Sequence, residues 1–142
     1  MESSRESLGF LLADVSRLMR QNFQRRLEGS SLTMAQARVL VFVARREGIR
    51  QVELAELLEV QPITLARLVD QLAEVGLVER RPDPSDRRAY QLFLTSAAAP
   101  HLAAIEEVGA TIRADALRDL SDEDATIVMS ALSRMRDNLG SR

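Results

Sequence analysis

The stretch that decides the fold is residues 51–95, which read QVELAELLEVQPITLARLVDQLAEVGLVERRPDPSDRRAYQLFLT. Leucines and alanines at helical spacing predict a short helix over 51–58, followed by a turn. Pro62 opens a second helix, because proline is favoured in the first turn of a helix. Gly76 followed by Leu77 is typical of a helix end at which glycine adopts the left-handed conformation. The predicted buried stripe of the second helix consists of Leu65, Leu68, Val69 and Leu72.

The remainder of the stretch predicts a β-hairpin. We expect strands over 77–82 and 90–95, on either side of a run of turn-forming residues. The Asp-Pro-Ser-Asp run between them supplies turn chemistry, so Arg87 and Arg88 are expected at the hairpin tip. A two-stranded hairpin is not stable alone and must pack on the helices. This order predicts a winged helix-turn-helix.

Two helices are predicted before this stretch. Apolar residues at three- and four-residue steps over 8–27 indicate an amphipathic helix that ends at Gly29. Thr33 then caps the next helix, and Gln36 stands where a capping box places glutamine. Gly48 is expected to end that helix.

Two further helices are predicted after the hairpin. Apolar residues recur at helical spacing through 97–139, and Ser121 is the expected N-cap of the second of these helices. We therefore predict a mainly α fold with a small β-hairpin, forming one domain over residues 1–142. The winged helix-turn-helix is expected over about 33–95, with dimerisation helices over about 6–29 and 97–139. A monomer whose first helix covers its own core is the alternative.

The residue inventory excludes several classes of function. The chain has 142 residues with 46% hydrophobic content and no cysteine, so disulfides, thiolate metal sites and cysteine nucleophiles are excluded. His101 is the only histidine, and no phosphate-cradling glycine loop or zinc-ligand spacing is present. We predict neither an enzyme nor a cofactor or metal site.

The sequence also indicates where the protein resides. No apolar run approaches the roughly 18 residues that a membrane-spanning helix needs. Residues 1–6 lack the basic and then apolar pattern of a signal peptide. We expect a soluble cytoplasmic protein that does not associate with membranes.

Charge is unevenly distributed along the chain. The net charge is −2, but residues 1–50 hold nine arginines against five acidic residues, whereas residues 51–95 hold five against eight. All 19 basic residues are arginine, which suits bidentate contacts and is equally explained by genomic codon bias. The acidic balance of 51–95 leaves open a second possibility, a winged helix that binds another protein instead of DNA.

The outward face of the second helix carries groups that suit a DNA major groove. Arg67 can donate two hydrogen bonds to guanine, Gln61 can pair with adenine, and Ile63 can contact a thymine methyl group. The alternative for Arg67 is a solvated side chain paired with Asp70 or Gln71 one turn later. An exposed isoleucine beside it has no evident structural use, which favours the DNA-binding interpretation.

The arginines of the hairpin suit a DNA minor groove. Arg87 and Arg88 can enter the narrow groove of A·T-rich sequence, and Asp86 can pair with one arginine and hold the other outward. The alternative is a solvated loop with weak internal ion pairs. Residues near helix N-termini favour phosphate, although capping explains Thr33 equally well. The predicted DNA-binding residues are Thr33, Gln36, Arg38, Gln51, Gln61, Pro62, Ile63, Thr64, Arg67, Arg81, Arg87 and Arg88.

The hairpin and its flanks complete a known pattern. Residues 76–80 (GLVER), 83–88 (DPSDRR) and 92–95 (LFLT) together resemble the signature of the MarR family of bacterial transcriptional regulators. The pairs Gln61-Pro62 and Ala99-Pro100 resemble its SlyA-like branch. The resemblance spans essentially the whole chain.

The resemblance implies a homodimer whose N- and C-terminal helices interlock. Two winged helices would then sit in successive major grooves of a pseudo-palindromic operator, as a repressor or an activator. Relatives commonly release DNA on binding a small aromatic or acidic ligand, and by position Arg17 and Arg20 supply cations near such a site. Ala37 stands where many relatives carry tryptophan, which argues against an aromatic-lined pocket.

Overall fold

The structure is a computed structural model that describes residues 7–140. It separates into two compact units, Met1–Gly109 and Ala110–Arg142. The expectation about a signal peptide concerns residues 1–6, which lie outside the described residues.

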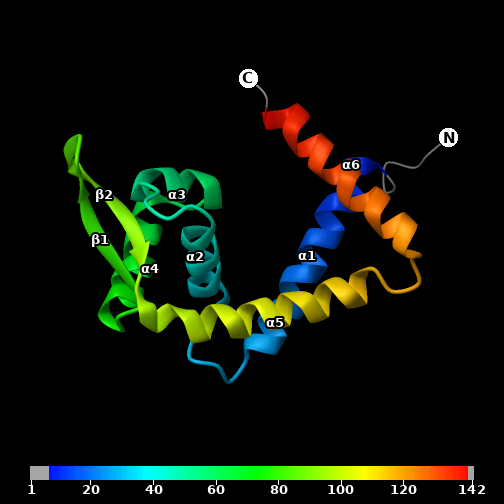
Figure 1. The fold of residues 1–142 in the computed structure, drawn as a ribbon, viewed down its shortest axis with the longest axis horizontal. Coiled ribbons are helices and arrows are strands. Elements are labelled where there is room, and N and C mark those ends of the chain that lie inside the picture. The colour runs from blue at the N-terminus through cyan, green and yellow to red at the C-terminus, as the bar shows by residue number, and fades with distance from the viewer. Residues whose placement is uncertain (1–6, 141–142) are drawn as a thin grey trace. The chain divides into compact units, whose positions relative to one another are not determined.

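In chain order the elements are α1 (Leu8–Leu27), α2 (Met34–Arg45), α3 (Gln51–Leu58), α4 (Pro62–Glu74), β1 (Val78–Asp83), β2 (Asp86–Leu94), the 3-10 turn η2 (Ser96–Ala98), α5 (Ala99–Ala116) and α6 (Asp122–Gly140) (Figure 1). The predicted mainly α fold with one antiparallel hairpin is confirmed. The extent of the domain stays a prediction.

Local chemistry sets the ends of the helices around the hairpin. The Thr33 hydroxyl accepts a hydrogen bond from the Gln36 amide at 3.1 Å, and the Gln36 side chain accepts one from the Thr33 amide at 3.0 Å. This confirms the capping box of α2. At the end of α4, Gly76 has φ +78° and the Leu77 amide donates to the Leu72 carbonyl at 2.9 Å, as in a Schellman motif.

The end of α2 lies earlier than predicted. The helix stops at Arg45, three residues before Gly48. The reason is that the segment after α2 pairs with β2: the Gly48 amide donates to the Leu92 carbonyl, and the Leu92 amide donates to the Ile49 carbonyl, both at 2.9 Å. Gly48 has φ +88°, so this glycine makes a turn onto the edge of the hairpin and does not cap the helix.

The core lies beneath α2, α3, α4 and the hairpin. The largest fully buried side chains include Leu40 of α2, Leu54 of α3, Leu65 and Leu72 of α4, and Leu92 of β2. Every one of these elements therefore contributes to a single hydrophobic cluster. Burial of this face of α4 leaves the opposite face of the helix toward solvent.

The hairpin is longer than predicted. Strand β2 begins at Asp86, four residues before the expected start. It pairs with β1 in one register from Val78↔Leu94 to Pro82↔Tyr90, and the register then shifts so that Asp83 pairs with Asp86. The Asp83 carboxylate accepts hydrogen bonds from the Ser85 amide at 2.8 Å and the Ser85 hydroxyl at 2.7 Å, which tightens the turn. Arg87 and Arg88 are consequently strand residues beside the turn, which corrects their expected place at its tip.

Helices α1 and α6 each carry an apolar surface that the chain leaves exposed. Neither helix has a buried residue. Exposed large apolar side chains of α1 include Leu8, Phe10, Leu11, Val15 and Leu18, and those of α6 include Ile127, Met129, Leu132 and Leu139. Across residues 7–140, no helix combines the length and apolar character needed to cross a membrane.

Candidate nucleic-acid interface

The outward face of α4 presents the side chains that the sequence assigned to it. Gln61, Pro62, Ile63, Thr64 and Arg67 are all exposed, and Ile63 is 67% exposed. They lie opposite the buried stripe of the helix. Together these side chains form a mixed polar and apolar face, whose side-chain types suit contacts to DNA bases.

Arg67 keeps a free guanidinium because its possible helical partners are engaged elsewhere. The Asp70 carboxylate lies 2.7 Å from Nη1 of Arg80, and the Gln71 side chain accepts a hydrogen bond from Gln36 at 3.0 Å. Within residues 7–140, no hydrogen bond or ion pair joins the Arg67 side chain to another residue. The alternative in which Arg67 pairs with Asp70 or Gln71 does not occur.

Arg80 connects three elements. From β1 its Nε donates to the Gln51 side chain of α3 at 2.8 Å, and its Nη2 donates to the Ala66 carbonyl of α4 at 3.1 Å. Its ion pair with Asp70 adds a second contact to α4. The Arg80 side chain is only 24% exposed, so it stabilises the packing of α4 and is not available as a free cation of the hairpin. Sequence reasoning missed this role because none of these partners is a neighbour in the sequence.

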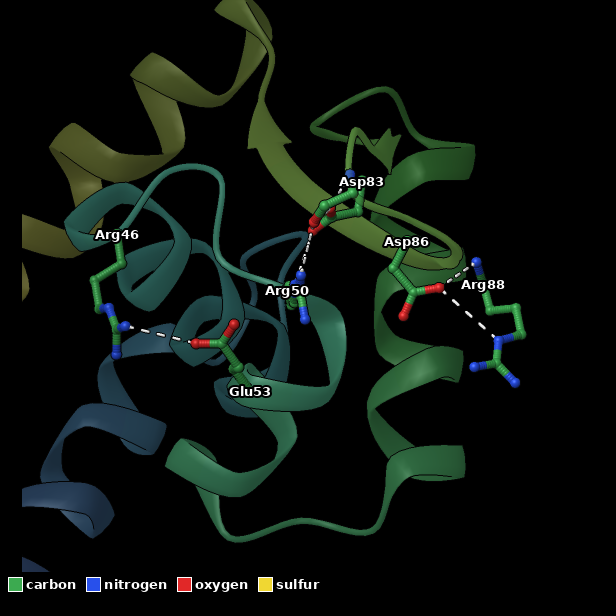
Figure 2. A network of polar contacts seen from close by, with 7 residues as sticks. Arg46, Arg50, Glu53, Asp83, Asp86 and Arg88 are labelled. Atoms are coloured by element: carbon green, nitrogen blue, oxygen red, sulfur yellow. Dashed lines mark hydrogen bonds and ion pairs between the residues drawn. The ribbon is translucent and has the colours of Figure 1, made fainter.

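The arginines of β2 differ in their contacts. Arg88 lies 3.8 Å from the Asp86 carboxylate through Nε, and its amide donates to the same carboxylate at 2.9 Å (Figure 2). The Arg87 side chain forms no hydrogen bond or ion pair with another residue in the described part of the chain. Asp86 therefore pairs with one arginine and leaves the other free, as the sequence suggested.

Arg81 is engaged within the hairpin. Its guanidinium lies over the Phe93 ring, 3.9 Å from the centroid, and pairs with Glu79. Register places Glu79 opposite Phe93, so the three side chains lie on one face of the hairpin. A cation held over a ring in this way stabilises the strand pair.

A further ion pair joins the hairpin turn to α3 and was not foreseen. Nε of Arg50, the N-cap residue of α3, donates to the Asp83 carboxylate at 2.7 Å (Figure 2). Asp83 is 7% exposed and is the one buried charged residue in the part of the chain that the structure describes. Hydrogen bonds from Ser85, assisted by Arg50, lower the pKa of Asp83 from 3.8 to about 2. The Asp-Pro-Ser run signalled a turn, but nothing in it identified Arg50.

The predicted phosphate-binding residues of α2 cluster at its N-terminal half. Thr33 is exposed and forms the cap, whereas the Gln36 side chain is shared between the cap and Gln71. The Arg38 guanidinium lies 6.0 Å from the Phe42 ring centroid. All three residues lie at the N-cap or in the first two turns of α2.

The two arginines proposed to bind a ligand lie on the exposed surface of α1. Arg17 is 3.4 Å from the Asp14 carboxylate, and Arg20 donates to the Ser16 hydroxyl at 2.7 Å. Both contacts are local to the helix. A ligand-binding role for Arg17 and Arg20 stays a prediction.

The helix–turn–helix, the paired hairpin and the exposed face of α4 define a winged-helix protein. The sequence pattern of the MarR family matches residues 32–90. A MarR crystal structure has 29% sequence identity and a TM-score of 0.85, covering 98% of this chain and 95% of that one. The SlyA structure has 27% identity, covers 90% of each chain, and has a TM-score of 0.74.

A variant of MarR from E. coli complexed with operator DNA is also similar. It has 27% identity and a TM-score of 0.72, and the match covers 90% of this chain and 92% of that one. These likenesses extend well beyond the winged helix itself. The chain is therefore similar to the MarR family over residues 32–90, and its fold resembles that of solved MarR and SlyA structures.

Proposed function

We propose that this protein is a sequence-specific DNA-binding transcriptional regulator that acts as a homodimer on a pseudo-palindromic operator. The observation that carries the proposal is the outward face of α4, where an unpaired Arg67 lies beside the exposed Ile63. A helix fits into the major groove, where arginine recognises guanine and an apolar side chain contacts a thymine methyl group. Gln61, the N-cap residue of α4, reads adenine in this proposal.

In this proposal the hairpin contacts the neighbouring minor groove. Arg87, which is unpaired within the described residues, enters the groove, and Arg88 contacts its edge. Thr33 and Arg38 bind phosphate with Pro62 and Thr64 at the start of α4. Gln36, Gln51 and Arg81 have their side chains in internal contacts, so we assign them a supporting part at the interface.

The dimer is supported by the exposed apolar surfaces of α1 and α6. Apolar surface of this extent on helices is expected to be covered by a partner. A second copy of the chain is that partner in our proposal. Two winged helices then bind half-sites about 34 Å apart, one turn of DNA.

We further propose a small aromatic or acidic effector that releases DNA. The support is the pair of exposed arginines of α1, Arg17 and Arg20, which can bind a carboxylate. Millimolar benzoate is a suitable probe: it should raise the Kd for DNA in the wild type and leave the Arg17→Ala/Arg20→Ala variant unchanged. Placement in the SlyA-like branch rests on Gln61-Pro62 and Ala99-Pro100, since 27% identity to SlyA and 29% to MarR do not separate the branches.

The test is selection of bound DNA from a random pool at moderate salt, followed by sequencing. We expect an enriched palindrome, and Arg67→Ala should relax base preference at one position per half-site. Arg46→Ala is the matched control, since Arg46 forms only an exposed pair with Glu53 at 3.7 Å. Absence of enrichment from a folded dimer, before and after refolding to remove bound ligand, would favour the second candidate, a protein-interaction module. The acidic balance of residues 51–95 is the observation that favours that candidate.

A further inference from the structure

The ion pair between Arg80 and Asp70 removes the nearest carboxylate from Arg67. Asp70 lies three residues after Arg67 on α4, a spacing at which oppositely charged side chains pair on a helix. Arg80 reaches Asp70 from β1 at 2.7 Å, while its Nε and Nη2 are fixed by Gln51 and Ala66. The fixed guanidinium gives Asp70 a partner that does not depend on Arg67.

We propose that Arg80 is a positioning residue for DNA recognition: by neutralising Asp70 it keeps the Arg67 guanidinium unpaired and available to the DNA. Arg80 contacts no base in this scheme and acts only through Asp70. The inference rests on the proposed function, because it assumes that Arg67 reads the operator. In this proposal the specificity of α4 for DNA depends in part on Arg80 of β1.

The physical argument concerns what happens when Arg80 is lost. Asp70 is 65% exposed, so an unneutralised carboxylate there remains in solvent and free to rotate toward Arg67. Two hydrogen bonds to guanine require both donors of one edge of the Arg67 guanidinium, which a pair with Asp70 would occupy. The same carboxylate would also repel nearby phosphates. Loss of Arg80 should therefore weaken recognition although Arg67 is intact.

The companion contact at Gln71 supports the same arrangement. Gln71 lies four residues after Arg67, and its side-chain oxygen is occupied by the Gln36 amide group at 3.0 Å. Both acceptors that lie one turn after Arg67 are thus engaged by side chains from other elements. Gln71 is uncharged, so we expect Asp70 to have the larger effect.

The experiment measures Kd for the selected operator and for a scrambled duplex, and compares their ratio among variants. The ratio is the Kd for the scrambled duplex divided by the Kd for the operator, so a larger value means greater specificity. Arg80→Gln should lower this ratio about two- to tenfold, a change between the effect of one exposed helical ion pair and that of a weak arginine–guanine contact. Arg80→Gln/Asp70→Asn should return the ratio to within about twofold of the wild type. Asp70→Asn alone should leave it unchanged. Arg46→Gln, which removes a charge from an exposed pair, is the control.

A conservative variant separates this mechanism from a purely structural one. Arg80→Lys keeps a cation near Asp70 but cannot reproduce the three contacts of the guanidinium. Because the proposal depends on the positive charge and not on those contacts, this variant should retain the wild-type ratio. Thermal unfolding followed by circular dichroism checks that each variant is folded. If Arg80→Gln is unfolded, a reduced ratio for folded Arg80→Lys would overturn the proposal.

Two results would overturn the inference about Arg80 and leave the proposed function unaffected. One is an Arg80→Gln ratio equal to wild type although Arg67→Ala lowers it. The other is a double variant no better than Arg80→Gln, which would mean that the contacts to Gln51 and Ala66 matter and Asp70 does not. An Arg67→Ala ratio equal to wild type would instead overturn the assignment of Arg67 in the proposed function.

Discussion

The Nε atom of Arg50 donates to Oδ2 of Asp83 across 2.7 Å and joins residues that are 33 positions apart in the chain. Arg50 is the N-cap residue of α3, and Asp83 is the last residue of β1. The Asp83 carboxylate also accepts from Ser85 at the turn, and Arg50 reaches the Ser85 hydroxyl at 3.2 Å. A single buried carboxylate therefore stabilises the turn of the hairpin and joins that turn to the start of α3.

The first prediction concerns pH. The pKa of Asp83 is lowered to about 2, chiefly by hydrogen bonds from Ser85, so the ionised form is favoured by folding. Stability from this carboxylate is therefore fully present above its ordinary pKa near 4 and is lost as pH falls toward 2. We expect Asp83→Asn to lower the melting temperature at neutral pH. The difference from wild type should shrink between about pH 4 and pH 2.

Thermal unfolding followed by circular dichroism at several pH values checks this prediction. Asp137→Asn is the matched control, because Asp137 is largely exposed and pairs with Arg136 only at 3.8 Å. Its melting temperature should follow the wild type at every pH. A constant difference between Asp83→Asn and wild type down to pH 2 would show that the ionised carboxylate contributes nothing.

The second prediction separates two roles of Thr33. The Thr33 hydroxyl caps α2, so Thr33→Ala should cost about 1 kcal/mol of unfolding free energy, and Thr33→Ser should restore most of it. If the residue also binds phosphate, Thr33→Ala should lower DNA affinity under conditions in which the variant is fully folded. Chemical denaturation and a DNA titration on the same samples measure both effects. Unchanged affinity would leave Thr33 with capping alone.

The sequence predicted features that depend on neighbouring residues. The capping box of Thr33 and Gln36 and the glycine stop at Gly76 were confirmed because each is set by local backbone hydrogen bonds. The partners of Arg80 and Arg50 could not be predicted, because they depend on how β1 packs against α3 and α4. The start of β2 was misplaced for a related reason.

That misplacement follows from the hydrogen bonds of one carboxylate. The polar run from Asp83 through Arg88 lacks the apolar alternation that marks a strand, so the sequence indicated a long loop. Asp83 closes the turn around Ser85, and backbone pairing then extends β2 to Asp86 regardless of side-chain polarity. The candidate site was predictable on α4, where a buried stripe determines the outward face, but less so on the hairpin.

The third prediction tests the dimer surface of α1. Leu11 is 50% exposed, and in our proposal a second copy covers it. Leu11→Glu should raise the dimer dissociation constant by at least about tenfold, because a carboxylate without a partner is costly to bury. Sedimentation velocity over a range of concentrations measures the change. Val52→Glu is the control, since Val52 is an exposed apolar residue of α3, outside the proposed dimer surface. A dimer unaffected by Leu11→Glu would exclude this part of α1 from the interface.

The last prediction ranks the two arginines of β2. Arg87 has no partner within residues 7–140, whereas Arg88 already interacts with Asp86, although its side chain is 94% exposed. A cation that must leave a carboxylate contributes less to DNA binding than a free one, because the lost ion pair offsets part of the gain. Arg87→Ala should therefore reduce affinity more than Arg88→Ala, most clearly at sites with A·T-rich flanks.

Salt dependence distinguishes this ranking from a difference in folding. If Arg87 displaces one counterion, the slope of log affinity against log salt should become shallower by about 0.9 in Arg87→Ala. Arg88→Ala should change the slope by less, and Asp86→Asn should raise the contribution of Arg88 by removing its partner. Circular dichroism of the wild type and the three variants checks that all four proteins are folded. Equal slopes for Arg87→Ala and wild type would remove Arg87 from the DNA contacts, and a larger change in Arg88→Ala would reverse their roles.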